Sequence, residues 1–434
     1  MSETDLERAT MRKVLRRFLP ILFLCFIVSF LDRVNVGFAA LTMNEDLGLS
    51  SKAFGFGAGL FFLTYFLFEV PSNLALERFG ARRWIARIMF TWGLLSATTA
   101  FVRGEHSFYA VRLLLGASEA GFYPGVIFFF TLWVPAGHRA RAIAVLATAM
   151  PVANAIGSPL SGLLMQLNGM AGLKGWQWMF LIEALPALLL TPVVLRLLSD
   201  RPADAAWLSA AERDWLSQRL TQERRDRVGT EQQRLVDLLR SVPIIFLAMA
   251  YFGMTGINYG LSFFLPQIVK QFGLSVVQTG FVSAIPAAVA LVGMTWWGRR
   301  SDRLAERRLH LLLPLSLAAL SLAGSTVAGP PVMKLALLSV AALGILCALP
   351  IFWTLPTRLL APTIAAAGIA LINSVGNLSG FVDPYAIGAI KDATGSFSGG
   401  LQLISFFGVC SIVILAILTR QEQPQTQPAL TREI

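Results

Sequence analysis

Long apolar segments recur along the whole chain, and each is bounded by charged residues or by proline and glycine. A helix needs about 20 mostly apolar residues to cross the hydrocarbon core of a bilayer. A soluble chain of this length would divide into about two or three cores with polar surfaces, and this sequence has no polar residues to form them. The pattern therefore predicts an all-α membrane protein with twelve transmembrane helices. The expected helices are 19–41, 54–76, 84–102, 107–133, 140–167, 176–198, 242–268, 276–297, 309–328, 332–354, 363–389 and 397–419.

Composition points to lipid as the surrounding medium. Only 14% of the residues are charged and 55% are apolar, whereas soluble domains carry about 25% charged residues. Cys25, Cys347 and Cys410 lie far apart in apolar segments, so we expect neither a disulfide framework nor a metal site. The glycine-rich run 55–59 lies within an expected membrane helix and follows no strand, so it predicts no nucleotide cofactor.

The distribution of basic residues predicts the topology. The net charge is +11, which in a soluble protein would suggest nucleic acid as a partner. Of the 36 lysines and arginines, however, 28 fall in segments that would face the cytoplasm if the N-terminus is inside. The six loops on the other side hold one each, and Arg33 and Arg112 lie within helices. This alternation follows the positive-inside rule, so we expect cytoplasmic termini and no nucleic-acid partner.

One polar stretch, 199–241, lies at the midpoint of the chain. Ser209 and Glu212 within it have the spacing of a capping box, which predicts a short amphipathic helix. We therefore expect three parts. An N-terminal six-helix bundle spans 1–198, a cytoplasmic linker spans 199–241, and a C-terminal six-helix bundle spans 242–434.

Two matching loops support this division. Glu77 and Arg78 follow the second expected helix, and Asp302 and Arg303 follow the eighth, 225 residues later. The first and seventh expected helices are offset by about the same amount. A repeat of this kind predicts two parallel halves related by an axis along the membrane normal.

The two loops resemble a signature of the major facilitator superfamily, in which an acid, an arginine, a glycine and a basic pair follow helices 2 and 8. The first copy departs from it, with Asn73 for the usual glycine and Glu77 for aspartate. The segments 31–39 and 112–125 resemble the anion:cation symporter branch, whose members include tartrate, phthalate and galactonate permeases. The resemblance covers nearly the whole chain. It implies two pseudo-symmetric six-helix bundles in a bacterial inner membrane, and we expect a monomer. It also implies a conformational latch at Glu77, Arg78, Asp302 and Arg303.

Four ionisable side chains lie deep in the expected helices 1 and 4, where charge is costly and usually functional. Asp32, Arg33, Arg112 and Glu119 sum to zero charge. Arg112 and Glu119 lie on one helix face but about 10 Å apart along the axis, so each needs a partner on another helix. A substrate carboxylate added to this group would make it negative and favour protonation of Asp32 or Glu119. Proton and organic anion would then bind together, which is symport.

The roles of individual residues follow from this argument and from the resemblance. Arg33 has the planar fork that binds a carboxylate through two hydrogen bonds, and the resemblance implies a substrate role for it. The resemblance also implies that Asp32 and Glu119 carry protons, and we expect Arg112 to organise the two acids. Four further residues match cavity-lining positions of the family: Tyr65, Trp353, Asn373 and Asn377.

These observations predict a proton-coupled importer of a small organic anion, such as a sugar acid, a hydroxy-dicarboxylate or an aromatic acid. An exporter or an anion exchanger on the same scaffold is the alternative. A membrane-embedded enzyme is disfavoured, because the sequence shows no nucleophile–base pair, metal cluster or phosphate loop. The roles of Glu183 and Asp383 stay open. Asp383 either pairs locally or disfavours dianionic substrates.

Overall fold

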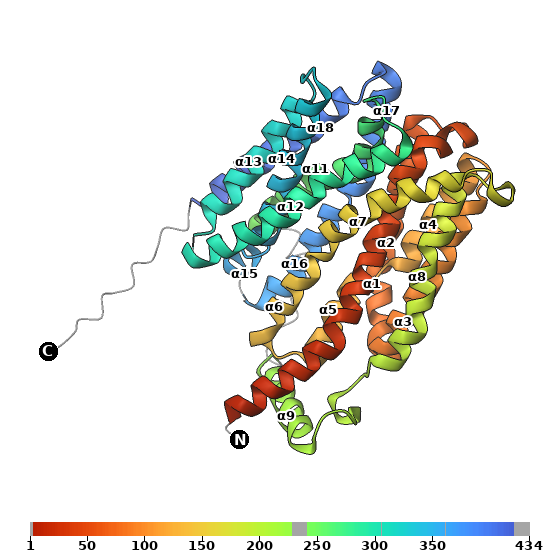
Figure 1. Ribbon diagram of the computed structural model, residues 1–434. Helices are drawn as coiled ribbons and strands as arrows, with labels where there is room; N and C mark the ends of the chain where they lie inside the picture. Colours follow the sequence, from red (N-terminus) through yellow and green to blue (C-terminus); the bar gives the residue numbers. More distant parts are fainter. Residues whose placement is uncertain (1–2, 228–240, 305, 361, 421–434) are drawn as a thin grey trace.

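The computed structural model describes residues 3–227, 241–304, 306–360 and 362–420, and the described part is helical with short connections. The first half of the chain holds eight α-helices among the described residues (Figure 1). They are α1 (Glu3–Leu47), α2 (Ser51–Phe79), α3 (Ala81–Thr98), α4 (Glu105–Glu119), α5 (Phe122–Trp133), α6 (Ala136–Ala147), α7 (Ala149–Leu164) and α8 (Gly175–Leu197).

The second half repeats this arrangement. A short linker helix, α9 (Ala210–Arg227), precedes it. The membrane helices are α11 (Val242–Lys270), α12 (Val276–Leu304), α13 (Arg308–Ser325), α14 (Pro331–Phe352), α15 (Pro356–Leu359), α16 (Pro362–Asn377), α17 (Ser379–Thr394) and α18 (Ser398–Leu418).

Each of the twelve expected segments is helical, but three of them are broken where the sequence predicts one continuous helix. The segment 107–133 breaks between α4 and α5, where Gly121 has a φ of 86°. The segment 140–167 breaks at Thr148, between α6 and α7, and the segment 363–389 breaks at Leu378, between α16 and α17. An apolar pattern reports burial, not the local dihedral angles that end a helix. The expectation of continuous helices was therefore wrong at these three places.

Ten helical spans in the described part are long and apolar enough to cross a membrane. The two remaining spans fail for local reasons. Helix α3 begins with Arg82, Arg83 and Arg87, which shortens its apolar stretch. The span of α16 and α17, two helices of 16 residues each, is also not among the ten.

The helices pack as two groups whose largest mutual contacts form two seams, and α1 and α11 also touch across the groups. Helices α1 to α8 pack among themselves, as do α11 to α18, and the seams join α2 to α17 and α7 to α12. In the first seam, a Cβ on Gly55 would lie 2.1 Å from the carbonyl oxygen of Pro384, so only glycine allows this approach. Asp392 at the end of α17 accepts hydrogen bonds from the backbone N–H groups of Ser51 and Lys52, at 3.0 and 2.8 Å.

Both seams lie toward one end of the bundle. We call this end, where α2 begins and α17 ends, the seam end. The other end, where α1 begins and α9 lies, carries the arginine-rich segments 78–83, 299–304 and 306–308, and we call it the basic end (Figure 1). The close contacts of Gly55 and Gly388 involve the first half of α2 and none of its last turns. The two halves are thus joined at the seam end.

The linker helix packs on the basic end. Ser209 and Glu212 form the expected capping box, with reciprocal bonds of 3.3 and 2.9 Å. Glu212 also pairs with Lys13 of α1 at 2.8 Å, and Trp207 stacks on Trp133 with ring centroids 5.6 Å apart. The boundaries of the three predicted parts stay a prediction, and residues 228–240 of the linker lie outside the described residues.

Candidate functional site

A cavity of about 190 Å³ lies between the two halves, with walls from α1, α2, α5, α6, α7, α11, α12, α14 and α16. Its lining is mostly aromatic and aliphatic, with amides and hydroxyls at separate points. Among the described residues that line it, Arg33 is the only charged one. All five residues predicted to bind substrate line this cavity: Arg33, Tyr65, Trp353, Asn373 and Asn377.

Arg33 is joined to Glu119 across the space between α1 and α4. Its Nε and Nη2 both donate to Oε1 of Glu119, at 2.9 and 2.7 Å, and Ser29 donates to the same oxygen at 2.8 Å. The guanidinium also lies 5.1 Å from the ring centroid of Tyr65, where the ring face attracts a cation. The expectation that Glu119 needs a partner on another helix is confirmed.

The break between α4 and α5 determines the position of the Glu119 carboxylate. Helix α4 ends at Glu119 and the chain turns at Gly121, whose positive φ favours glycine. A Cβ on Gly121 would also lie 2.3 Å from Oγ of Ser72 on α2. The turn therefore holds the end of α4 against α2, and Glu119 faces Arg33 of α1.

Asp32 points away from the cavity, toward α3. It is 3% exposed. Its carboxylate accepts hydrogen bonds from Nε1 of Trp92, from Ser96 at 2.9 Å and from Asn35 at 3.3 Å. Adjacent residues on a helix point about 100° apart, which explains why Asp32 and Arg33 face different neighbours. These three hydrogen bonds offset part of the cost that burial imposes on the ionised carboxylate.

Arg112 does not contact the two acids that it was expected to organise. Its Nη2 donates to the carbonyl oxygen of Ala58 at 3.1 Å, and its guanidinium lies 4.9 Å from the ring centroid of Phe61. Within the described residues, no hydrogen bond or ion pair joins Arg112 to Asp32 or Glu119. A direct organising contact is therefore not made in this conformation, because the Arg112 side chain is directed to α2.

The second half supplies neutral polar groups. Tyr259 donates from its hydroxyl to Oδ1 of Asn377 at 3.1 Å, and Asn258 and Thr255 of α11 also line the cavity. Sequence reasoning missed Thr255 and gave Asn258 and Tyr259 less weight than the five residues predicted to bind substrate. The internal repeat indicates two of these positions. Asn258 and Tyr259 follow Asp32 and Arg33 by 226 residues, which is close to the offset between the two halves.

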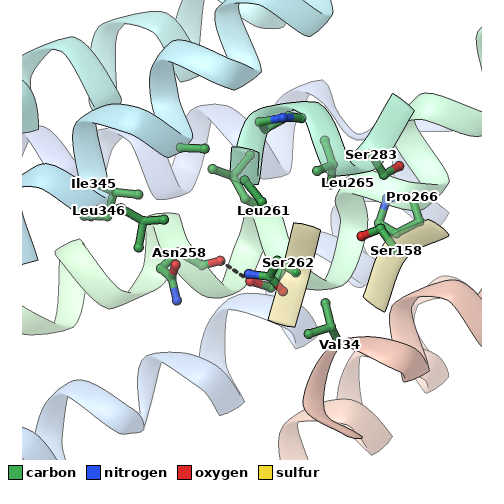
Figure 2. A pocket seen from close by; sticks show the side chains of 14 residues that line it. Val34, Ser158, Asn258, Leu261, Ser262, Leu265, Pro266, Ser283, Ile345 and Leu346 are labelled. Carbon is green, nitrogen blue, oxygen red and sulfur yellow. Dashed lines mark hydrogen bonds between the residues drawn. The ribbon is translucent and has the colours of Figure 1, made fainter. Parts of the chain in front are cut away.

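A smaller cavity of about 50 Å³ adjoins the first and shares Asn258 and Leu346 with it. Figure 2 shows Asn258, Ser262 and Ser158 around this space, with Ser262 donating to the carbonyl oxygen of Asn258 at 2.9 Å. Asn258 therefore stands in the wall between the two cavities.

The two acids left open by the sequence are both deeply buried. Glu183 of α8 is 1% exposed and accepts a hydrogen bond from Ser161 at 2.7 Å. Asp383 of α17 is 0% exposed, and a Cβ on Gly256 of α11 would lie 2.4 Å from its Oδ2. Neither oxygen of Asp383 has a hydrogen-bond partner in the described part of the chain. Asp383 therefore forms no local pair within the described part of the chain, which was the first of its two alternatives.

The latch residues are found at the basic end. Asp302 forms an ion pair with Arg307, at 2.7 Å. At the first copy, Asp200, which follows α8, accepts a hydrogen bond from the backbone N–H of Arg82 at 2.9 Å. Over the ranges that the structure describes, no ion pair joins Glu77, Arg78 or Arg303 to another residue. The latch role stays a prediction.

Comparison with known proteins identifies the family. Residues 22–384 match the model of the Major Facilitator Superfamily. The chain belongs to this superfamily. A protein of Agrobacterium vitis, named provisionally as a tartrate transporter, is 50% identical over 96% of this chain and 92% of its own length. A quinolone resistance transporter of Acinetobacter baumannii is 42% identical over 96% of this chain and 98% of its own length.

A solved structure supports the fold. The xylose transporter XylE from E. coli, in a partially occluded inward-open conformation, superposes with a TM-score of 0.74. The two chains are 14% identical, with 95% of this chain and 99% of that chain covered. The fold is therefore the all-α membrane fold of the Major Facilitator Superfamily. The protein is a multi-pass membrane transporter rather than an enzyme.

Proposed function

We propose that this member of the Major Facilitator Superfamily imports a small organic anion by proton symport. The observation that carries the proposal is the pairing of Arg33 with Glu119 at the wall of the central cavity. An arginine lining an otherwise uncharged cavity favours an anionic ligand. The name of the relative from Agrobacterium vitis supports a carboxylate such as tartrate.

The pairing supports a mechanism of coupling. While Glu119 is ionised, it occupies the two donors with which Arg33 would bind a carboxylate. Protonation of Glu119 removes its charge and frees Arg33 for the substrate. Proton and anion thus bind as a neutral pair, which costs less desolvation than either charge alone. In this mechanism, Asp32 is a second acid whose protonation changes the charge of the site.

The neutral groups of the second half would hold the rest of the substrate. Asn373 and Asn377 lie one turn apart on α16 and both line the cavity. Amides donate and accept hydrogen bonds, so they suit hydroxyl and carbonyl groups. Trp353 offers a ring face to the apolar side of the substrate. Tyr65 completes the wall beside Arg33.

The positions of the two seams support the proposal that the transporter is open to the cytoplasm in this structure. Both seams lie at the seam end, from which we infer that the cavity opens toward the basic end. The positive-inside rule assigns the basic end to the cytoplasm of a bacterial inner membrane, together with both termini. The transporter is then open to the cytoplasm, and rocking of the two halves would expose the same site on the other side. A reporter fused at residue 220 that reads as extracellular would refute this topology.

Transport by the purified protein in proteoliposomes tests the proposal. Labelled tartrate, a sugar acid and an aromatic acid are supplied outside, with an inside-alkaline pH gradient. Accumulation of one of them above its external concentration, lost when a protonophore is added, is the expected result. Equal uptake with and without the gradient would overturn proton symport.

The relative from Acinetobacter baumannii favours a second candidate, an exporter on the same scaffold. Export would require the proton to enter while the substrate leaves. Reversing the direction of the pH gradient in the same proteoliposomes distinguishes the two. An importer accumulates substrate only when protons and anion move in the same direction.

A further inference from the structure

Glu183 of α8 is a buried acid that the proposed mechanism does not use. It is 1% exposed, and its neighbours come from α1 and α7. Ser161 of α7 donates to Oε1 at 2.7 Å, and Oε2 has no hydrogen-bond partner among the described residues. A carboxylate with one free oxygen in such a site is costly when ionised.

The Asn35 amide lies between Glu183 and Asp32. Its Nδ2 donates to Oδ1 of Asp32 at 3.3 Å, and its side chain also interacts with Glu183. The two acids interact electrostatically as well. Asp32, Asn35 and Glu183 thus form a continuous polar chain from α1 to α8, inside the first half of the protein.

Few charged side chains surround the polar chain of Asp32, Asn35 and Glu183. Glu183 faces Asp32 of α1, while the groups that α3 and α7 contribute to the chain, including Ser161, are neutral. Asp32 also interacts with Glu119 and Arg112, both of α4. No ion pair joins Asp32 or Glu183 to a cation in the part of the chain that the structure describes. Two interacting carboxylates that form no direct ion pair with a cation are not both ionised in a buried site, because each charge opposes the other.

The hydrogen bonds decide which acid holds the proton. Asp32 accepts from three donors, and Glu183 from one hydroxyl. We propose that Glu183 is a proton-binding site of this transporter beyond Glu119 and Asp32, and that it forms one coupled acid pair with Asp32 through Asn35. In this conformation the proton resides on Glu183 and the negative charge on Asp32. The two acids titrate together, so a change of charge on one shifts the proton on the other.

The inference deepens the proposed function, since Asp32 belongs to the proposed coupling group. Any step that neutralises Asp32 lowers the cost of ionising Glu183. Glu183 therefore supplies a place, away from the substrate, to which a proton can be moved within the first half. It lies outside the cavity and does not contact the substrate.

Infrared spectroscopy of the purified protein across a pH series tests the proton site directly. A protonated carboxyl group has a C=O stretching band separate from that of a carboxylate. We expect a band in the wild type that is absent from Glu183→Gln and present in Ser161→Ala. We also expect the band to persist to higher pH in the wild type than in Asp32→Asn, because an ionised Asp32 opposes a second charge.

Two results would overturn the inference. A band that is unchanged by Glu183→Gln assigns the proton elsewhere. A band that responds to Glu183→Gln but has the same pH dependence in Asp32→Asn removes the coupling. Neither outcome depends on substrate. Failure of gradient-driven accumulation in the wild type would instead refute the proposed symport and leave the infrared result intact.

Discussion

Arg33 donates two hydrogen bonds to a single oxygen of Glu119, Oε1, while Oε2 of the same carboxylate has no partner among the described residues. A bidentate pair would use both oxygens and would hold more firmly. The one-sided geometry leaves the guanidinium bound to a group that a substrate carboxylate can replace. It also leaves Oε2 open to a proton. The structure thus joins the proposed anion and proton sites in one contact.

The first prediction concerns the geometry of Arg33. Arg33→Lys keeps the charge and removes the planar fork, so we expect substrate affinity to fall about tenfold or more, since a hydrogen bond to a charged group contributes about 1.5–3 kcal/mol. Binding of labelled substrate to purified protein measures this. Membrane insertion should match the wild type, as checked by gel filtration of a fluorescent fusion. Normal affinity in the lysine variant would exclude Arg33 as the carboxylate ligand.

The second prediction separates the two acids. Glu119→Gln mimics the protonated acid, so binding should persist and depend less on pH, while accumulation driven by a pH gradient should fail. Exchange of labelled for unlabelled substrate should survive, because it needs no return of the empty carrier. Asp32→Asn is the matched comparison. If only Asp32→Asn loses accumulation, Asp32 is the coupling acid, and if both variants accumulate normally, the charge-balance mechanism is wrong.

The third prediction concerns the neutral side of the cavity. Asn377→Ala should weaken substrate binding about fivefold, because a net hydrogen bond contributes about 1 kcal/mol. Tyr259→Phe, which removes the hydroxyl that donates to Asn377, should have a smaller effect of the same sign. Asn154→Ala is the control, because Asn154 lines only the smaller cavity. An equal loss in the control would indicate general destabilisation.

The fourth prediction uses the seam between α2 and α17. The backbone N–H of Lys52 bonds to Asp392 at 2.8 Å, so cysteines at these two positions lie within reach of a short cleavable cross-linker. Cross-linking should stop uptake by holding the seam end closed, and cleavage should restore it. Binding of substrate from the basic end should persist in both the cross-linked and the cleaved protein. Uptake that continues in fully cross-linked protein would show that this seam does not open during transport.

The fifth prediction concerns the linker and pH. Burial opposes ionisation of Glu212, but hydrogen bonds from Lys13 and Ser209 outweigh it and hold the pKa of its carboxyl below the usual value. A lowered pKa gives stability that is present above the usual value, about 4.3, and is lost as the pH falls through the folded-state pKa. Glu212→Gln should therefore lower the melting temperature at pH 7, and the difference from the wild type should shrink in acid. Asp214→Asn, exposed on the same helix, should have no such effect.

The sequence by itself determined the membrane class, the positions of the twelve spans and the identity of five of the residues that line the cavity. Each depends on local information. Spans follow from apolar length, and the family motif places Arg33 and Glu119 on known helices. The capping box at Ser209 and Glu212 was likewise readable, because its two bonds join residues three apart.

Only the tertiary structure decided which partner each buried charge takes. Arg112 lies seven residues from Glu119 on one helix, yet it bonds to Ala58 of α2, because the direction of a side chain depends on the neighbouring helix. The pairing of Glu119 with Arg33 and the approach of Asn35 to Glu183 join residues far apart in the chain. Such contacts depend on how helices pack against one another. The spacing of residues along one sequence does not give the distances between side chains on different helices.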